Sequence, residues 1–103
     1  MTIKRRKKET FSRWDPADHL KSEEDMAGYL QACLEEAPED PALIAAALGD
    51  IARAQGMGRL ARETGLTREG LYKALSKNGN PSLGTVLKVL KALGLKFTAE
   101  VAS

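Results

Sequence analysis

The chain has 103 residues, enough for one domain with a single modest core, and 43% of them are hydrophobic while only 5% are aromatic. No apolar run is long enough to span a membrane, and no apolar segment of a signal peptide follows the basic N-terminus. Cys33 is the single cysteine, which excludes a disulfide framework and a thiolate metal cluster, so we expect a cytoplasmic protein.

The charge is unevenly distributed along the chain. Residues 1–21 hold seven Lys or Arg and three acids, residues 22–50 hold eight acids and no Lys or Arg, and residues 51–103 hold nine Lys or Arg and three acids. The three parts therefore carry +4, −8 and +6, which add to the net charge of +2. This separation favours a polyanionic partner for the last part of the chain, although ordinary solvated helix faces give a similar pattern.

Residues 1–21 are expected to form a basic, partly disordered arm. The run KRRKK at 4–8 either follows a DNA backbone or serves as a solubilising tail. The following stretch turns at Asp15-Pro16, and three bulky residues in it lie outside any helical repeat: Phe11, Trp14 and Leu20. These residues either cover the chain's own core or enter the groove of a partner. His19 has no second metal ligand nearby in sequence, so we assign no metal site.

Two helices are predicted before residue 56. Ser22 and Asp25 have the spacing of a capping box, and the apolar stripe that follows predicts a helix over 22–37: Met26, Tyr29, Leu30, Cys33, Leu34 and Ala37. Cys33 is expected to be an inert core residue of that stripe. Asp40 as N-cap and Pro41 at the first helical position predict a second helix over 41–55. Its inner face is expected to contain Ile44, Ala47, Leu48, Ile51 and Ala52.

Residues 57–76, MGRLARETGLTREGLYKALS, predict two short helices, 58–64 and 68–76, joined by a tight turn. Ala61 allows the two helices to cross closely, Gly65 accepts a positive φ at the corner, and Leu71 fixes the second helix. This spacing is typical of a helix-turn-helix, whose second helix enters the DNA major groove. A helical corner of a bundle, with no nucleic-acid partner, remains the alternative.

The last predicted helix runs over 83–93, with Ser82 as its cap, Gly94 as its stop, and an inner face of Leu83, Val86, Leu87, Leu90 and Leu93. Apolar and polar residues then alternate over 95–101, which predicts a half-buried β-strand paired with a symmetry mate, an N-terminal segment or a partner chain; a frayed tail is the alternative. We therefore expect an all-α domain over 22–103, with five helices and a short C-terminal strand.

From Pro16 onward the chain resembles the addiction-module antidote proteins, which are HigA-like antitoxins of the Cro/C1 (XRE) helix-turn-helix superfamily. The matching pieces are WDPADHL (14–20), DMAGYLQACLEEA (25–37), ALGDIARAQGM (47–57), LARETGLTREGLYKALS (60–76) and NPSLGTVLKVLKALGLKFT (80–98). The resemblance implies a lambda-repressor-like DNA-binding domain that forms a homodimer and represses its own operon. It also implies a partner, a RelE/HigB-like toxin that cleaves mRNA. The chain departs from the family pattern at Gly58, Arg59 and Gly70.

The candidate site residues follow from the proposed motif. The expected DNA contacts come from the second motif helix, the helix before it and the turn after it: Arg59, Thr67, Arg68, Glu69, Tyr72, Lys73, Lys77, Asn78, Asn80 and Ser82. Arg68 is suited to a guanine edge and Glu69 to a cytosine amino group, whereas Tyr72 and Lys73 are suited to the backbone. Phe11, Trp14 and Leu20, together with the acidic helix 22–37, are candidates for contact with the toxin.

Two other functions remain open, a stand-alone transcription regulator without a toxin and a protein-interaction module whose motif is only structural. An enzyme is disfavoured because the sequence offers no carboxylate pair, metal spacing, activated nucleophile or phosphate-binding glycine loop. We expect no cofactor, no metal and no membrane partner.

Overall fold

The computed structural model describes residues 16–102. A short 3-10 helix, η1 (Pro16–His19), precedes five α-helices: α2 (Glu23–Glu36), α3 (Pro41–Gln55), α4 (Met57–Thr64), α5 (Arg68–Ala74) and α6 (Leu83–Leu93). The five predicted helices are confirmed, and α5 ends two residues earlier than expected. No helix in this part of the chain is both long enough and apolar enough to cross a membrane.

The predicted helix caps are present. The Ser22 hydroxyl accepts a hydrogen bond from the backbone N–H of Asp25 at 3.0 Å, and the Asp25 carboxylate accepts one from the N–H of Ser22 at 3.2 Å, which completes the capping box. Asp40 accepts from two N–H groups at the start of α3, and Ser82 accepts from the N–H of Thr85. Because these bonds satisfy N–H groups that have no partner within the helix, they fix where α2, α3 and α6 begin.

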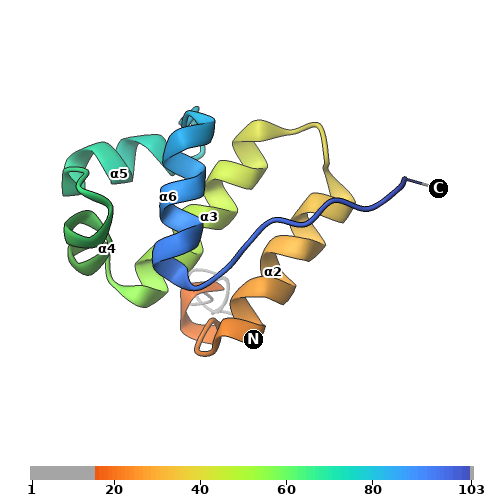
Figure 1. Ribbon diagram of the computed structural model, residues 1–103, viewed down its shortest axis with the longest axis horizontal. Helices are drawn as coiled ribbons and strands as arrows, with labels where there is room; N and C mark the ends of the chain where they lie inside the picture. The colour runs from red at the N-terminus through yellow and green to blue at the C-terminus, as the bar shows by residue number, and fades with distance from the viewer. Residues whose placement is uncertain (1–15, 103) are drawn as a thin grey trace, which may run out of the picture.

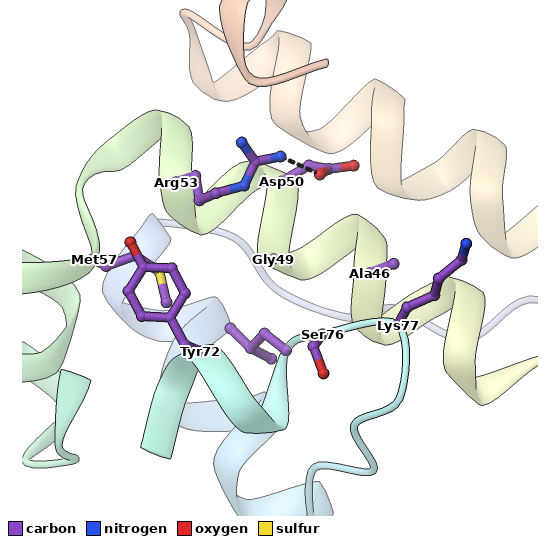
Figure 2. Close-up of a pocket in the computed structure, with 9 residues that line it drawn as sticks. Ala46, Gly49, Asp50, Arg53, Met57, Tyr72, Ser76 and Lys77 are labelled. Carbon is purple, nitrogen blue, oxygen red and sulfur yellow. Dashed lines mark hydrogen bonds and ion pairs between the residues drawn. The ribbon is translucent and has the colours of Figure 1, made fainter. Parts of the chain in front are cut away.

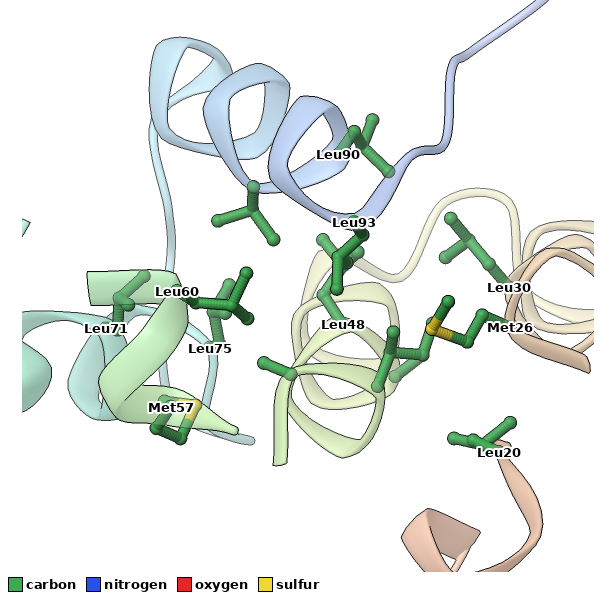
Figure 3. Packing of buried hydrophobic residues seen from close by; sticks show 14 residues of the cluster. Leu20, Met26, Leu30, Leu48, Met57, Leu60, Leu71, Leu75, Leu90 and Leu93 are labelled. Carbon is green, nitrogen blue, oxygen red and sulfur yellow. The ribbon is translucent and has the colours of Figure 1, made fainter. Parts of the chain in front are cut away.

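Helix α3 lies between α2 and the pair α4–α5, and α6 crosses in front of it in the view of Figure 1. Helix α3 packs against η1, α2 and α4, while α4 also packs against α5 and α6. Figure 3 shows Leu48 of α3 near the middle of the core, with residues of α4 and α5 on one side and residues of α2 on the other. The fully buried large side chains are Met26, Leu48, Ile51, Leu60, Leu71, Val89 and Leu90.

The predicted inner face of α6 is partly wrong. Leu90 and Leu93 are buried as expected, but Leu83 is 69% exposed and Leu87 is 50% exposed, while Val89 is buried in their place. The helix is rotated so that its buried stripe is centred between Val89 and Leu93. Helix α6 packs against α4, and contact with a neighbouring helix determines which of its apolar residues are covered.

The predicted C-terminal strand is absent. Residues 95–101 follow α6 without forming a strand or a bridge, and the tail runs past α2 in Figure 1. A strand needs a neighbouring strand to accept and donate its backbone hydrogen bonds, and the rest of the described chain is helical. Leu95 packs on the core, but Phe97 is 43% exposed and Val101 is 96% exposed, so the alternation does not produce one buried face.

Two glycines control how α3 meets the pair α4–α5. Gly56, at φ 101° and ψ 110°, is both the last cap of α3 and the first cap of α4, so one residue connects the two helices. Gly49 lies against the end of α5, where a Cβ atom would collide with the carbonyl oxygen of Leu75. Gly49 therefore allows α3 and α5 to approach to backbone contact.

Candidate nucleic-acid interface

The predicted corner between α4 and α5 is present. Gly65 has the left-handed conformation, at φ 76°, and its N–H donates to the carbonyl of Ala61 at 3.0 Å. The Thr64 hydroxyl donates to the carbonyl of Leu60 at 2.7 Å and accepts from the N–H of Leu66 at 3.3 Å. Leu60 and Leu71 are fully buried on the inner side of the corner. Hydrogen bonds to the backbone and burial in the core therefore both stabilise the turn.

The outer side of α5 is exposed and polar. Four of its predicted site residues lie there: Arg68, Glu69, Tyr72 and Lys73. The guanidinium carbon of Arg68 lies 5.5 Å from the centre of the Tyr72 ring, which is cation–π geometry. This contact aligns Arg68 along the helix surface, while Lys73 extends from the following turn of the helix. The face offers two cations, one carboxylate and an aromatic ring to a partner.

Two predicted site residues act first as helix caps. The Thr67 hydroxyl accepts a hydrogen bond from the N–H of Gly70 at 2.9 Å, at the start of α5. The Ser82 hydroxyl accepts from the N–H of Thr85 and donates to the Thr85 hydroxyl, both at 3.1 Å. Capping alone therefore explains why Thr67 and Ser82 stand at these positions. Of the two hydroxyls, only that of Thr67 still has a proton to donate to a phosphate.

The turn after α5 brings further predicted residues beside that helix. Asn78 and Asn80 line an open hollow of about 270 Å³ together with Gly70 and Lys73 of α5. The structure therefore places these two asparagines next to the second motif helix. Gly70, one of the departures from the family pattern, forms part of the wall of this hollow, and a Cβ there would lie 2.8 Å from the Thr67 hydroxyl oxygen.

A second open hollow, of about 320 Å³, lies between α3 and the end of α5 (Figure 2). Asp50 and Arg53 line it from α3, while Tyr72, Ser76 and Lys77 line it from α5 and the turn that follows. Lys77 therefore lines a different hollow from Asn78 and Asn80, although all three residues belong to the turn after α5. Arg53 was not among the predicted DNA contacts, although it lies beside Tyr72.

Asp50 of α3 accepts two short hydrogen bonds, one from α2 and one from within α3. It accepts from the Tyr29 hydroxyl at 2.6 Å and from the Arg53 guanidinium at 2.6 Å. Burial and the bond to Asp50 together raise the pKa of Tyr29 well above its usual value. Burial also raises the pKa of the Cys33 thiol, and the nearby Glu36 and Asp50 add to this effect, which favours the protonated and less reactive form.

Arg59 is bound within the fold. Its guanidinium pairs with Glu63 at 3.0 Å, donates to the Gln55 side chain at 3.3 Å and donates to the carbonyl of Ala92 at 3.4 Å. The last bond connects α4 to the end of α6. A phosphate that binds Arg59 has to compete with these three acceptors.

The structure describes only one of the three bulky residues predicted to contact a toxin. Phe11 and Trp14 lie outside the described residues. Leu20 is 4% exposed and belongs to the core, so its side chain covers the chain's own helices. No group of three His, Cys, Asp or Glu residues within 16–102 is arranged to hold a metal ion.

Comparison with known proteins gives one family and one relative. The family described as "Probable addiction module antidote protein" matches residues 10–101. An uncharacterized protein from Haemophilus influenzae is 51% identical over 92 residues, which cover 89% of this chain and 93% of that protein. No solved structure matches the chain.

Proposed function

We propose that this chain, which belongs to the family of probable addiction module antidote proteins, neutralises the toxin of its module and represses their shared operon by binding DNA through α4 and α5. In this proposal the chain is a HigA-like antitoxin of the Cro/C1 (XRE) superfamily, the domain is lambda-repressor-like, and the toxin is RelE/HigB-like. The chain acts in the cytoplasm, where its operator lies, and has no catalytic activity.

One observation carries the DNA-binding part of the proposal. The exposed polar face of α5 stands on a corner whose inner side is fully buried, so its side chains are presented on a rigid support. A helix held in this way fits the DNA major groove and reads bases with the residues of its first turns. Arg68 and Glu69 occupy those turns, and Lys73 lies further along, where it meets phosphate.

The two kinds of contact have different consequences for binding. Bidentate hydrogen bonds from Arg68 to a guanine distinguish one base pair from another, whereas Lys73 on a phosphate adds affinity to every sequence. Binding as a homodimer would place two copies of α5 on half-sites about 34 Å apart, one helical turn of DNA. We expect the operator to be an approximate palindrome with that spacing.

The test is a titration of DNA from the chain's own promoter with the protein, measured by fluorescence anisotropy and repeated at several salt concentrations. Arg68→Ala is expected to cost about 1–3 kcal/mol on the operator and to relax the preference at one base pair. Lys73→Ala is expected to weaken binding to operator and random DNA alike and to reduce the salt dependence by about one unit of slope. Lys88→Ala, which removes the same charge from an exposed site on α6, is the control.

Four results would contradict the assignment. Equal losses on operator and random DNA for Arg68→Ala would remove its base-reading role. Unchanged DNA binding in both variants would remove α5 from the interface. A chain that binds its toxin but no DNA would be a protein-interaction module, and a chain that represses without any toxin encoded beside it would be a stand-alone regulator.

A further inference from the structure

A groove lined by both apolar and polar residues runs between α2 and the C-terminal tail. One wall consists of Ala27, Leu30, Gln31 and Leu34 of α2, and the other consists of residues 95–98. The space between the two walls is about 110 Å³. We call this surface the α2–tail groove. Within it Phe97 is 43% exposed, and Val101, further along the tail, is 96% exposed. Large apolar side chains left uncovered beside a hollow mark a surface that a partner can cover.

The rim of the α2–tail groove is acidic on the side of α2, whereas Lys96 on the tail is basic. Helix α2 contains five acidic residues and no Lys or Arg. Glu35 accepts a hydrogen bond from Gln31 at 3.0 Å, which places its carboxylate at the edge of the groove. Glu24 lies one helical turn before Ala27, on the same side of α2. Glu23, the first residue of α2, lies so close to Gly94, just before the tail, that a Cβ on Gly94 would collide with its carboxylate.

We propose that the α2–tail groove is the docking surface for the toxin, and that it receives an apolar side chain of the toxin surrounded by basic residues. This inference rests on the proposed function, because it assumes that the chain binds a toxin. A toxin that cleaves RNA has to carry a basic surface for its polyanionic substrate, and the acidic rim complements such a surface. Neutralisation then follows directly, since a toxin bound here has its RNA-binding surface covered.

Charge also excludes two other occupants. DNA meets the carboxylates of α2 with like charge. A second copy joined by a two-fold axis would bring two acidic α2 helices together, which costs free energy at an interface of this kind. The groove lies on a different part of the molecule from α5 (Figure 1), and the acidic α2 beside it disfavours a polyanionic partner.

The test measures affinity for the toxin encoded in the same operon. The toxin is co-expressed with the full chain, separated under denaturing conditions, refolded and titrated with each variant. Phe97→Ser combined with Val101→Ser is expected to raise the Kd at least about tenfold, because an exposed aromatic anchor is typical of the residues that dominate binding. Leu87→Ser, at another exposed apolar site on α6, is the matched control and is expected to leave the Kd unchanged.

The rim is tested separately from the apolar contact. Glu24→Gln combined with Glu35→Gln is expected to slow association several-fold at low salt and to flatten its salt dependence, because charges at a rim act mainly on the association rate. Thermal unfolding of every variant without toxin shows whether the fold is intact. Both pairs of substitutions are at exposed positions, so we expect folded proteins.

The outcomes separate this inference from the proposed function. If the wild-type chain does not bind the toxin, the antidote function itself is wrong. If the wild type binds and the Phe97 and Val101 variant binds equally well, the groove is not the docking surface. A lower mass of that variant without toxin, measured by light scattering, would assign the groove to a second copy. A changed fluorescence emission of Trp14, the single tryptophan, in that variant without toxin would assign the groove to the chain's own residues 1–15.

Discussion

Replacing Tyr29 by Phe tests the connection between α2 and α3. The substitution removes one hydroxyl and leaves the aromatic ring, so the apolar contacts of the side chain are kept. Asp50 then loses the donor at 2.6 Å and retains only Arg53, also at 2.6 Å. The free energy of unfolding should fall, because a carboxylate that accepted two hydrogen bonds now has one.

The size of this loss follows from the surroundings of Asp50. A hydrogen bond to a charged group contributes about 1.5–3 kcal/mol when both partners are buried. The Asp50 side chain is 21% exposed, so water can partly replace the missing hydroxyl. We therefore expect Tyr29→Phe to cost about 1–2 kcal/mol, which lowers Tm by about 4–8 °C for each kcal/mol in a domain of this size.

The assay is urea unfolding followed by circular dichroism, with Tyr72→Phe as the matched control. Tyr72 is exposed, and its hydroxyl makes no hydrogen bond within residues 16–102. This control should change the free energy of unfolding by less than about 0.5 kcal/mol. A cost for Tyr29→Phe no larger than that of Tyr72→Phe would refute the claim that the bond to Asp50 holds α2 on α3.

The comparison of Tyr29→Phe with the wild type also gives a pH test. The pKa of Tyr29 is higher in the folded chain than in the unfolded one, so the neutral hydroxyl stabilises the fold. This contribution is fully present below about pH 10, where unfolded tyrosine is neutral, and is lost as the pH rises towards the folded pKa. The stability difference between wild type and Tyr29→Phe should therefore be constant from pH 7 to 9 and should narrow above about pH 10. A difference that does not change above pH 10 would contradict this account.

Further variants test the packing of the helices. Gly28→Ala should raise the free energy of unfolding by about 1 kcal/mol in urea titrations, because the position is exposed within α2 and an added Cβ meets no atom within 4 Å. Gly49→Ala should lower it by about 1–3 kcal/mol or more, because the added Cβ collides with the carbonyl of Leu75; a neutral result would mean that α3 and α5 are not in backbone contact. Arg59→Ala should cost at most about 1 kcal/mol, since its pair with Glu63 is exposed. In anisotropy titrations it should weaken DNA binding less than Lys73→Ala, and a larger loss would show that Arg59 leaves its internal partners for phosphate.

The local features of the fold were predictable because their causes lie within a few residues. Ser22, Asp40, Thr67 and Ser82 each bond an N–H two or three positions later, so the sequence spacing contains the whole interaction. Gly65 was likewise predictable from the local sequence, because the backbone at the corner needs a positive φ. For this reason the helices and the corner were predicted to within one or two residues at each end.

The features that depend on distant segments were not predictable. Helix α6 has apolar residues on more than half of its circumference, and its contact with α4 determines that Val89 is covered and Leu83 is not. The alternation over 95–101 has the period of a strand, but no strand is available to pair with it. Tyr29 and Asp50 are 21 positions apart, so nothing in the sequence around either residue indicates their bond.

The candidate site shows the same division. The exposed positions of Arg68, Glu69, Tyr72 and Lys73 follow from helical periodicity, and they lie outside as expected. Their roles in reading DNA stay predictions. The place of Arg53 beside Tyr72, and the internal partners of Arg59, come from the packing of α3 and α6 on the corner and could not be derived from spacing.

The single residue between α3 and α4 makes the chain sensitive to length at this point. Since Gly56 ends one helix and starts the next, no spare residue can absorb an insertion or a deletion. Each residue of an α-helix turns the chain by roughly 100°. One residue gained or lost near the end of α3 would therefore rotate α4 and α5 together about the axis of α3, and would direct the exposed face of α5 away from its present side of the molecule. Relatives that keep the same surface for α5 are thus expected to keep the length of α3, even where its side chains differ.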